Sequence, residues 1–416
     1  MQKILNIIKN AKTAYEGYVD PEFQDVATWF SKLQADRLTQ GGAAVVVYFR
    51  GKKVVDIYAG QQSSDQAWEP NSMAMCYSTG KGVLATLAHC VVSAGHLDYD
   101  QPIAHYWPEF AANGKAEITL RDVLSHQSGL FDIRHVIDDA SEMLDWQHML
   151  VKLAEAKPRF DAKQDAAYQP LTFGWLVGGL LEKATQQSLQ QLMQQYLLEP
   201  LSLSGAYFGV TDHLRPRIAT PLPSIKPNTV KQTKKTLAPR KKSLIDQVIE
   251  WSGQKPADFQ DGMIPKGMKH FSFFSEAGLK AVIPAANGVF DADSLAKIYA
   301  MLAAQGQWQD QILIKPDVFQ ALSEVQYRHR DRVMPIPMHW RLGYHRILTL
   351  GKRSEGFGHM GFNGSGAWCD PKRELSFAYI HNFPATSLTG DYQLWALSQA
   401  VLRCADCAID GRKGWF

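Results

Sequence analysis

A chain of 416 residues is long enough to bury a large core and to form two subdomains. Its 45% apolar and 20% charged residues are typical of a globular enzyme, and 44 basic against 41 acidic residues give a net charge of +3. This near balance argues against the concentrated basic face of a nucleic-acid-binding protein. No run of about 18 apolar residues occurs, so we expect no membrane-spanning helix. Residues 1–18 lack the apolar core of a signal peptide, and we therefore expect a cytoplasmic protein.

The first predicted elements are a helix and a β-hairpin. Residues 21–37 carry apolar side chains at helical spacing. Residues 43–58 are two strand-like runs joined by a turn at Arg50 and Gly51. The first run is apolar without interruption, which predicts a strand that is buried on both faces.

A serine and a lysine three residues apart, Ser78 and Lys81, begin the next predicted helix. At this spacing the two side chains lie about 60° apart around the helix axis, on one face. A serine hydroxyl needs a neighbouring base to become a nucleophile, and a lysine can serve when burial or nearby positive charge lowers its pKa. The motif alone also fits an ordinary helix N-terminus, and Ser252 and Ser294 are likewise followed by a lysine three residues on.

Helical patterns dominate from 95 to 215 and are strongest over 170–200. Seven prolines and a basic run then occupy 214–268 and predict a long exposed excursion. We favour a solvated loop there over a phosphate- or membrane-binding segment. The basic residues of this run are Lys226, Lys231, Lys234, Lys235, Arg240, Lys241 and Lys242.

The C-terminal part returns to strands. A helix is predicted at 291–304, two strands at 366–369 and 375–380, and a final helix at 390–405. Among the five cysteines, the pair at 404 and 407 lacks the partners of a zinc site, so we interpret it as the end of this helix.

Strands near both ends, with helices between them, predict a discontinuous domain. Residues 1–90 and 270–416 would form an α/β (α+β) domain with one antiparallel sheet flanked by helices. Residues 91–269 would form a mainly helical subdomain. The Ser78 helix would pack between the two, at the kind of seam where ligand sites are common.

Two further stretches carry groups that suit chemistry. Tyr168 precedes a predicted helix, where its phenol could exchange protons with Lys81, and a nearby ammonium would lower its pKa; the alternative is a tyrosine at the edge of the core. Near His359 and Gly361, glycines beside a strand allow close approach of a ligand to backbone amides, whereas a lone histidine also suits a structural role. The Ser-His-Gln-Ser-Gly stretch at 125–129 is interpreted as a helix end with a structural role.

Several motifs follow one another in a fixed order: Ser78-Thr79-Gly80-Lys81, Leu-Asp-Tyr-Asp-Gln-Pro-Ile-Ala at 97–104 before Tyr-Trp-Pro, Ile-Thr-Leu-Arg-Asp-Val-Leu-Ser-His-Gln-Ser-Gly-Leu at 118–130, Tyr-Gln-Pro-Leu-Thr-Phe-Gly-Trp-Leu-Val-Gly at 168–178, Phe-Gly-His-Met-Gly-Phe-Asn-Gly-Ser at 357–365, and Asp370-Pro371. In this order the chain resembles the serine β-lactamase and penicillin-binding-protein superfamily over nearly its whole length. It is most similar to family VIII carboxylesterases, the esterase branch related to class C β-lactamases.

The resemblance implies a set of roles at the site. Ser78 would be the acylated nucleophile, with Lys81 and Tyr168 as its coupled base. The backbone amides of Ser78 and Phe362 would form the oxyanion hole. No metal and no organic cofactor would be needed.

The chain also departs from the β-lactamase pattern. His359-Met360-Gly361 stands where β-lactamases have Lys-Thr-Gly, so His359 and Gly361 would contact the substrate without the cation that helps to hold a β-lactam carboxylate. Pro170 replaces the asparagine of Tyr-x-Asn, which removes one polar substrate contact. Residues 162–164, Ala-Lys-Gln, replace the Pro-Gly-Thr that relatives often carry, so the pocket wall there is expected to differ.

Ester hydrolysis in two acyl-transfer steps is the function that we predict, on a small-molecule ester and without a nucleic-acid or membrane partner. Two alternatives stay open at this point. One is hydrolysis of β-lactams or D-amino-acyl peptides. The other is a non-catalytic scaffold on the same fold, against which the retention of Ser78, Lys81 and Tyr168 speaks.

Overall fold

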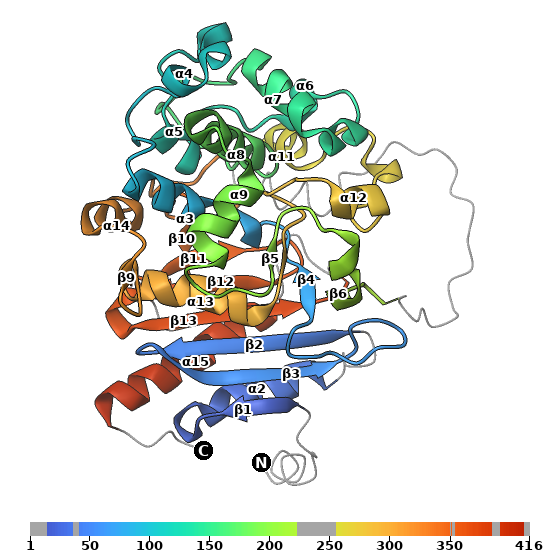
Figure 1. Ribbon diagram of the computed structural model, residues 1–416, viewed down its shortest axis with the longest axis vertical. Coiled ribbons are helices and arrows are strands. Elements are labelled where there is room, and N and C mark those ends of the chain that lie inside the picture. Colours follow the sequence, from blue (N-terminus) through green and yellow to red (C-terminus); the bar gives the residue numbers. More distant parts are fainter. Residues whose placement is uncertain are drawn as a thin grey trace.

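Strands from both ends of the chain form one antiparallel sheet. The computed structural model describes residues 15–35, 41–222, 255–349, 351, 354–384 and 392–411. Within them a seven-stranded sheet has the order β1-β3-β2-β13-β12-β11-β10 (Figure 1). Its strands are β1 (Glu16–Val19), β2 (Gly42–Phe49), β3 (Lys52–Gly60), β10 (His345–Arg346), β11 (Phe357–Met360), β12 (Gly366–Asp370) and β13 (Leu375–His381).

The pairing of β2 with β13 joins the two ends of the chain. Val47 lies opposite Phe377 in this antiparallel pair, which confirms the predicted common sheet. Arg50 and Gly51 have φ values of 49° and 74°, as a tight β2–β3 hairpin turn requires. All eight residues of β2 are buried, as its unbroken apolar run predicts.

Helices cover both faces of the sheet. Alternate residues of β2 belong to different cores: Val46 packs in the core that contains α13 (Ala292–Ala303), and Val47 packs in the core shared with α2 (Gln24–Gln34) and α15 (Tyr392–Asp410). This division follows from the two-residue period of a strand. Because both faces are covered, β2 contains no polar side chain other than the Tyr48 hydroxyl.

The Ser78 helix, α3 (Thr79–Ser93), lies between the sheet layer and the helical part, as predicted (Figure 1). It contacts α8 (Thr172–Thr185) on one side and both β11 and α13 on the other. Gly82 permits this close packing, since a Cβ there would lie 2.1 Å from the Tyr299 hydroxyl of α13. Only Val92 of its fifteen residues is not buried.

A group of helices forms the middle of the chain, and most of them are drawn in the upper part of Figure 1. These helices are α4 (Ile103–Tyr106), α5 (Leu120–Leu124), α6 (Ile133–Val136), α7 (Trp146–Glu155), α8 and α9 (Leu189–Met193), with further short helical segments at Pro108–Gly114, Ala140–Leu144 and Gln194–Leu198. The division into two domains stays a prediction.

Smaller elements connect these layers. A four-stranded sheet has the order β5-β7-β4-β6, and β8 pairs with β9. Their bounds are β4 (Met73–Met75), β5 (Ala206–Tyr207), β6 (Ile218–Ala219), β7 (Val289–Phe290), β8 (Gln307–Trp308) and β9 (Gln311–Ile312). The other helices in the described part of the chain are α11 (Pro256–Met263), α12 (Glu276–Lys280) and α14 (Pro316–Ser323), with short helical turns at Pro21–Phe23, Asp212–Arg217, Met268–His270 and Pro371–Arg373.

The prediction of an exposed excursion over 214–268 is wrong at the two ends of this segment, which the structure describes. There β6 pairs in parallel with β4, and α11 contacts α6. Apolar side chains such as Leu214 and Ile218 are buried in a small core with β4, which the proline-rich composition did not indicate. The basic residues from Lys226 to Lys242 lie outside the described residues.

Two sequence expectations concern the cysteines and the membrane. All five cysteines are free thiols, and Cys404 and Cys407 lie in α15, as predicted. Among the described helices, none combines the length and the apolar character that crossing a membrane requires.

Candidate active site

Ser78 stands immediately before α3, where Tyr77 bends the backbone sharply. Tyr77 has a φ of +48°, a left-handed conformation that costs a non-glycine residue roughly 1–2 kcal/mol. Its ring contacts Phe273 and Phe362, with centroids 6.3 Å and 6.0 Å away. This bend leaves Ser78 half-buried at the start of an otherwise buried helix.

The Lys81 side chain is fully buried and lies against the Ser78 hydroxyl. Its Nζ is 2.9 Å from Ser78 Oγ, 2.6 Å from the Pro170 carbonyl oxygen and 2.9 Å from the Ala285 carbonyl oxygen. Among the described residues, no carboxylate pairs with it. Burial without a compensating negative charge therefore lowers the pKa of Lys81 well below its usual value.

These contacts define how a neutral Lys81 is oriented. A neutral amine has two N–H groups and one lone pair. Carbonyl oxygens only accept hydrogen bonds, so the Pro170 and Ala285 carbonyls take the two N–H groups. The lone pair is then left for the third neighbour, Ser78 Oγ. In its neutral form Lys81 is thus placed to accept the serine proton.

Tyr168 reaches the same serine from the segment before α8. Its hydroxyl interacts with the Ser78 side chain, and Lys81 Nζ lies 5.0 Å from its ring centroid. Burial raises the pKa of Tyr168, and the interaction with Ser78 offsets this only in part. The expectation that the Lys81 ammonium lowers this pKa is therefore wrong: Tyr168 keeps its proton, because burial dominates.

The turn after β11 brings backbone amides next to Ser78. Gly361 permits this approach, since a Cβ there would lie 2.2 Å from the Cys76 carbonyl oxygen. The Thr79 hydroxyl donates to the Ser365 carbonyl at 3.2 Å and fastens the turn to the start of α3. Within the described part of the chain, neither the Ser78 nor the Phe362 N–H donates to another protein group. Both are thus available to a ligand oxygen.

His359 lies beside these groups as a neutral acceptor. Its Nδ1–H donates to the Met360 carbonyl at 2.9 Å, while its buried Nε2 has no partner in the described structure. Burial, followed by the proximity of His345 and Lys81, holds the pKa of His359 well below its usual value. His345 supports this arrangement, because its Nδ1–H donates to the Arg346 carbonyl at 2.7 Å and its Nε2 accepts from the Met360 N–H at 3.0 Å.

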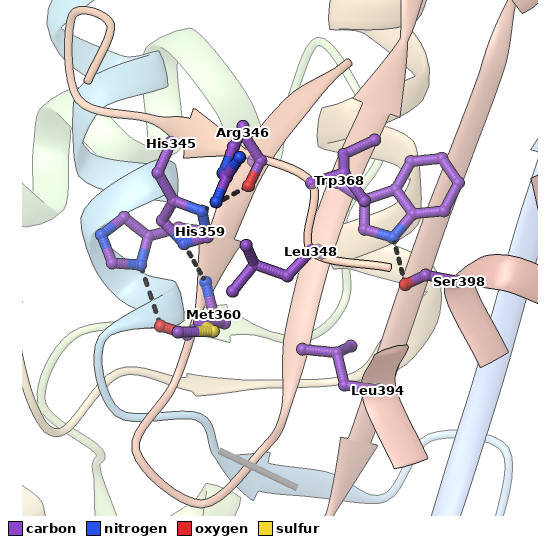
Figure 2. A pocket seen from close by; sticks show the side chains of 11 residues that line it. His345, Arg346, Leu348, His359, Met360, Trp368, Leu394 and Ser398 are labelled. Atoms are coloured by element: carbon purple, nitrogen blue, oxygen red, sulfur yellow. Dashed lines mark hydrogen bonds between the residues drawn. The ribbon is translucent and has the colours of Figure 1, made fainter. Parts of the chain in front are cut away.

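A small cavity lies behind this histidine pair. Figure 2 shows His345, His359 and Met360 along one side of it, with Leu348, Trp368 and Leu394 on the others. The lining is mainly apolar, and the Trp368 indole is already bonded to Ser398 at 2.9 Å. Ser78, Lys81 and Tyr168 do not line it. The cavity therefore meets the site at His359 and does not reach the serine.

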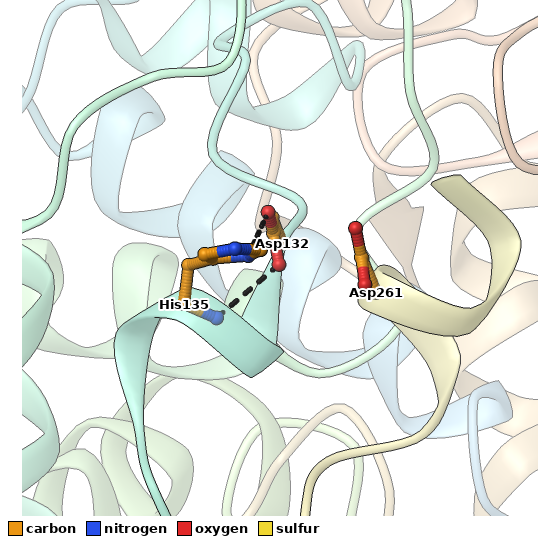
Figure 3. A group of neighbouring side chains, drawn as sticks. All are labelled: Asp132, His135 and Asp261. Atoms are coloured by element: carbon orange, nitrogen blue, oxygen red, sulfur yellow. Dashed lines mark hydrogen bonds and ion pairs between the residues drawn. The ribbon is translucent and has the colours of Figure 1, made fainter. Parts of the chain in front are cut away.

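A second cluster, Asp132, His135 and Asp261, has the composition of a metal site (Figure 3). Its ligand atoms lie within 4.8 Å of one another. The Arg159 guanidinium, however, pairs with Asp132 and lies 3.9 Å from Asp261 and 3.2 Å from His135 Nδ1. Arg159 supplies the positive charge that the two carboxylates require, so we assign this cluster as an ion-pair network.

The structure brings most of the predicted site together. Lys81 is hydrogen-bonded to Ser78 and lies over the Tyr168 ring, and β11 carries His359 and the following turn to the same place. Sequence reasoning missed Asp331, Trp340 and His126, which surround Tyr168 and are described below. His126 lies in the stretch at 125–129 that was interpreted as structural. The centroid of its ring is 5.1 Å from that of Tyr168. Asp331 and Trp340 lie in an irregular stretch whose sequence has no periodicity.

Comparison with known proteins shows the family of this chain. The family model described as "Beta-lactamase" matches residues 27–400. The curated protein "Esterase/beta-lactamase LipL" of Mycobacterium tuberculosis is 35% identical over 380 residues, which cover 88% of this chain and 82% of that protein.

Solved structures share the same fold. A family VIII carboxylesterase has a TM-score of 0.80 and 26% identity, covering 94% of this chain and 99% of the other. A penicillin-binding protein homologue from Caulobacter crescentus has a TM-score of 0.76 and 28% identity, covering 93% of this chain and 99% of the other.

Proposed function

The chain belongs to the beta-lactamase family, and on this basis we propose that it is a serine hydrolase that cleaves carboxylic esters through an acyl-enzyme on Ser78. The observation that carries the proposal is the environment of Lys81. A buried lysine with two carbonyls and a serine hydroxyl around Nζ, and no carboxylate, is arranged as a base.

The first step forms the acyl-enzyme. Ser78 Oγ attacks the ester carbonyl carbon while its proton moves to the Lys81 lone pair. The carbonyl oxygen becomes an oxyanion and accepts from the Ser78 and Phe362 N–H groups. On collapse, the bond to the alcohol oxygen breaks. That oxygen takes a proton from the Tyr168 hydroxyl. The Lys81 ammonium then gives its extra proton to the Tyr168 oxygen.

The second step releases the acid. Water attacks the acyl carbonyl carbon and gives its proton to the Lys81–Tyr168 pair. Ser78 Oγ leaves and regains a proton from the same pair. Every proton that is taken up in one step is returned in the next. The side chains of the site therefore account for all proton transfers of the two-step reaction.

His359 favours esters over β-lactams. A β-lactam carries a carboxylate, which requires a donor or a cation, whereas the unpartnered His359 Nε2 is an acceptor. Neutral small-molecule esters meet no such conflict. β-Lactam or D-amino-acyl peptide hydrolysis stays the second candidate, because the curated relative is named both an esterase and a β-lactamase. Cytoplasmic location stays a prediction from the sequence.

A panel of 4-nitrophenyl esters and a chromogenic cephalosporin, followed by mass spectrometry after treatment with a fluorophosphonate, tests this proposal. We expect ester turnover, and a mass increase on the peptide that contains Ser78. Ser78→Ala should lose nearly all turnover and the label while it keeps its melting temperature. Labelling of another serine, or turnover by folded Ser78→Ala, would show that the nucleophile is misassigned.

A further inference from the structure

The Tyr168 ring is held by aromatic neighbours rather than by other residues of its own segment. The Trp340 indole stacks on it with centroids 5.4 Å apart and planes 6° apart. His126 contacts the edges of both rings, 5.1 Å from Tyr168 and 4.3 Å from Trp340. Offset stacking of this kind fixes the plane of a ring but permits it to slide, so the position of Tyr168 depends on what holds Trp340.

Asp331 holds Trp340. The indole Nε1–H donates to Asp331 Oδ2 at 2.8 Å. The other carboxylate oxygen, Oδ1, accepts from the backbone N–H groups of Val333 and Met334, each at 2.7 Å. The Asp331 carboxylate also interacts with the Tyr168 backbone. One carboxylate therefore holds the indole by a hydrogen bond and also lies against the backbone of the tyrosine on which that indole stacks.

The surrounding loop is fastened to the Tyr168 segment at two more points. The Arg332 N–H donates to the Ala166 carbonyl at 2.9 Å, and the Arg332 side chain pairs with Asp165 at 2.7 Å. Tyr327 donates to the same Asp165 at 3.0 Å. These bonds fix the loop without Asp331, so the loop has other means of folding.

Holding a tryptophan with the Asp331 carboxyl lowers the folding stability of the protein. It is buried, with 3% of its surface exposed, and burial raises its pKa to about 6. An ionised carboxylate in this place opposes folding at neutral pH. Such a group is expected where geometry is needed more than stability.

We propose that Asp331 and Trp340 are positioning residues that hold the Tyr168 hydroxyl at the distance from Ser78 that proton transfer requires. This inference rests on the proposed function, in which Tyr168 moves a proton. Neither residue has a place among the reacting atoms, so their loss should lower kcat and leave KM nearly unchanged.

Two substitutions break the same bond from opposite sides. Asp331→Asn keeps an oxygen for the Val333 and Met334 N–H groups but turns an amide N–H toward the indole N–H. Trp340→Phe keeps an aromatic ring over Tyr168 and removes the indole N–H. Each should lower kcat for a 4-nitrophenyl ester about tenfold. Because they remove one shared interaction, the double variant should lose about tenfold and not a hundredfold.

The chain contains a matched control. Trp146 Nε1 donates to Glu182 Oε2 at 2.8 Å, the same indole–carboxylate bond in the helical part. Glu182→Gln and Trp146→Phe should therefore leave kcat within twofold of wild type. Melting temperatures of all variants separate folding from catalysis. If Asp331→Asn fails to fold, Trp340→Phe alone still decides the question.

The two levels of the proposal fail differently. If wild type cleaves no ester and Ser78 is not labelled by the fluorophosphonate, the proposed function is wrong. If wild type is active and Tyr168→Phe is impaired, but folded Trp340→Phe keeps its kcat or the two losses multiply, the positioning role is wrong. A rise in KM with unchanged kcat would also overturn it.

Discussion

Two buried lysines, Lys81 and Lys115, have nearly the same surroundings. Neither has any exposed surface. Each places Nζ against two backbone carbonyls, and Lys115 uses those of Ala112 and Ala156. Each also lies over an aromatic ring, 5.0 Å from Tyr168 for Lys81 and 5.3 Å from Phe110 for Lys115. Burial lowers both pKa values, that of Lys115 to about 8.

The difference is the third neighbour of the nitrogen. Lys81 has the Ser78 hydroxyl there, whereas no hydroxyl bonds to Lys115 in the described structure. Burial and carbonyl contacts are thus enough to lower a lysine pKa, but they do not make a catalytic base. A base also needs a proton donor beside its lone pair, and of these two lysines Lys81 alone has one in the described structure, the Ser78 hydroxyl.

Substitution of each lysine by methionine sharpens this contrast and should give the largest effect. Both variants leave two carbonyls without a donor, which costs about 1–3 kcal/mol of stability in either place. Lys81→Met should also lower ester turnover by about 10⁴-fold, the upper end for a positioned base, whereas Lys115→Met should keep wild-type turnover. Calorimetry and initial rates on one ester measure both quantities. Equal losses of activity in the two variants would mean that Lys81 has no catalytic role that Lys115 lacks.

Removal of the phenol should have the next largest effect. Tyr168→Phe loses only a hydroxyl, so we expect turnover to fall about 10²-fold with little change in melting temperature. The double variant with Lys81→Met should lose little beyond Lys81→Met alone, because the two groups act as a unit. Initial rates of all three variants test this. Full activity of Tyr168→Phe would reduce this tyrosine to a packing residue.

The elements with regular periodicity could be predicted from the sequence, because side-chain patterns report burial directly. The apolar run of β2 and the helix at Ala292–Ala303 are examples. The site could be predicted only where it lies on such elements, as Ser78 and Lys81 do, or where a motif points to it, as at Tyr168.

The rest depends on contacts between distant segments. The left-handed Tyr77 follows from packing against Phe273 and Phe362, which no local pattern reports. Asp331 and Trp340 lie in irregular chain, where side chains have no period to follow. The pKa of Tyr168 was predicted with the wrong sign, because the family resemblance implies a lysine nearby but does not report how deeply the phenol is buried.

Substitution of His359 should have the smallest effect. We expect it to change the selectivity between substrates rather than the rate of ester hydrolysis. His359→Lys places a cation where an acceptor stands, so activity on a carboxylate-bearing cephalosporin should rise about tenfold relative to a neutral ester. His359→Gln, which stays neutral, should leave this ratio unchanged and serves as the control. The ratio of kcat/KM values for the two substrates is the readout. An unchanged ratio in His359→Lys would place the substrate carboxylate elsewhere.

The pH dependence of Ser78 labelling by a fluorophosphonate tests the role of Lys81 most directly. Below its pKa Lys81 is protonated and has no lone pair for the serine proton; above it the amine is neutral and the base is present. Because burial lowers this pKa, the labelling rate should rise with pH to a plateau through an apparent pKa well below 10.5. Lys81→Met should abolish the rise, and Lys115→Met should preserve it. A rate that is independent of pH in wild type, or a rise that survives in folded Lys81→Met, would contradict the assignment of Lys81 as the base.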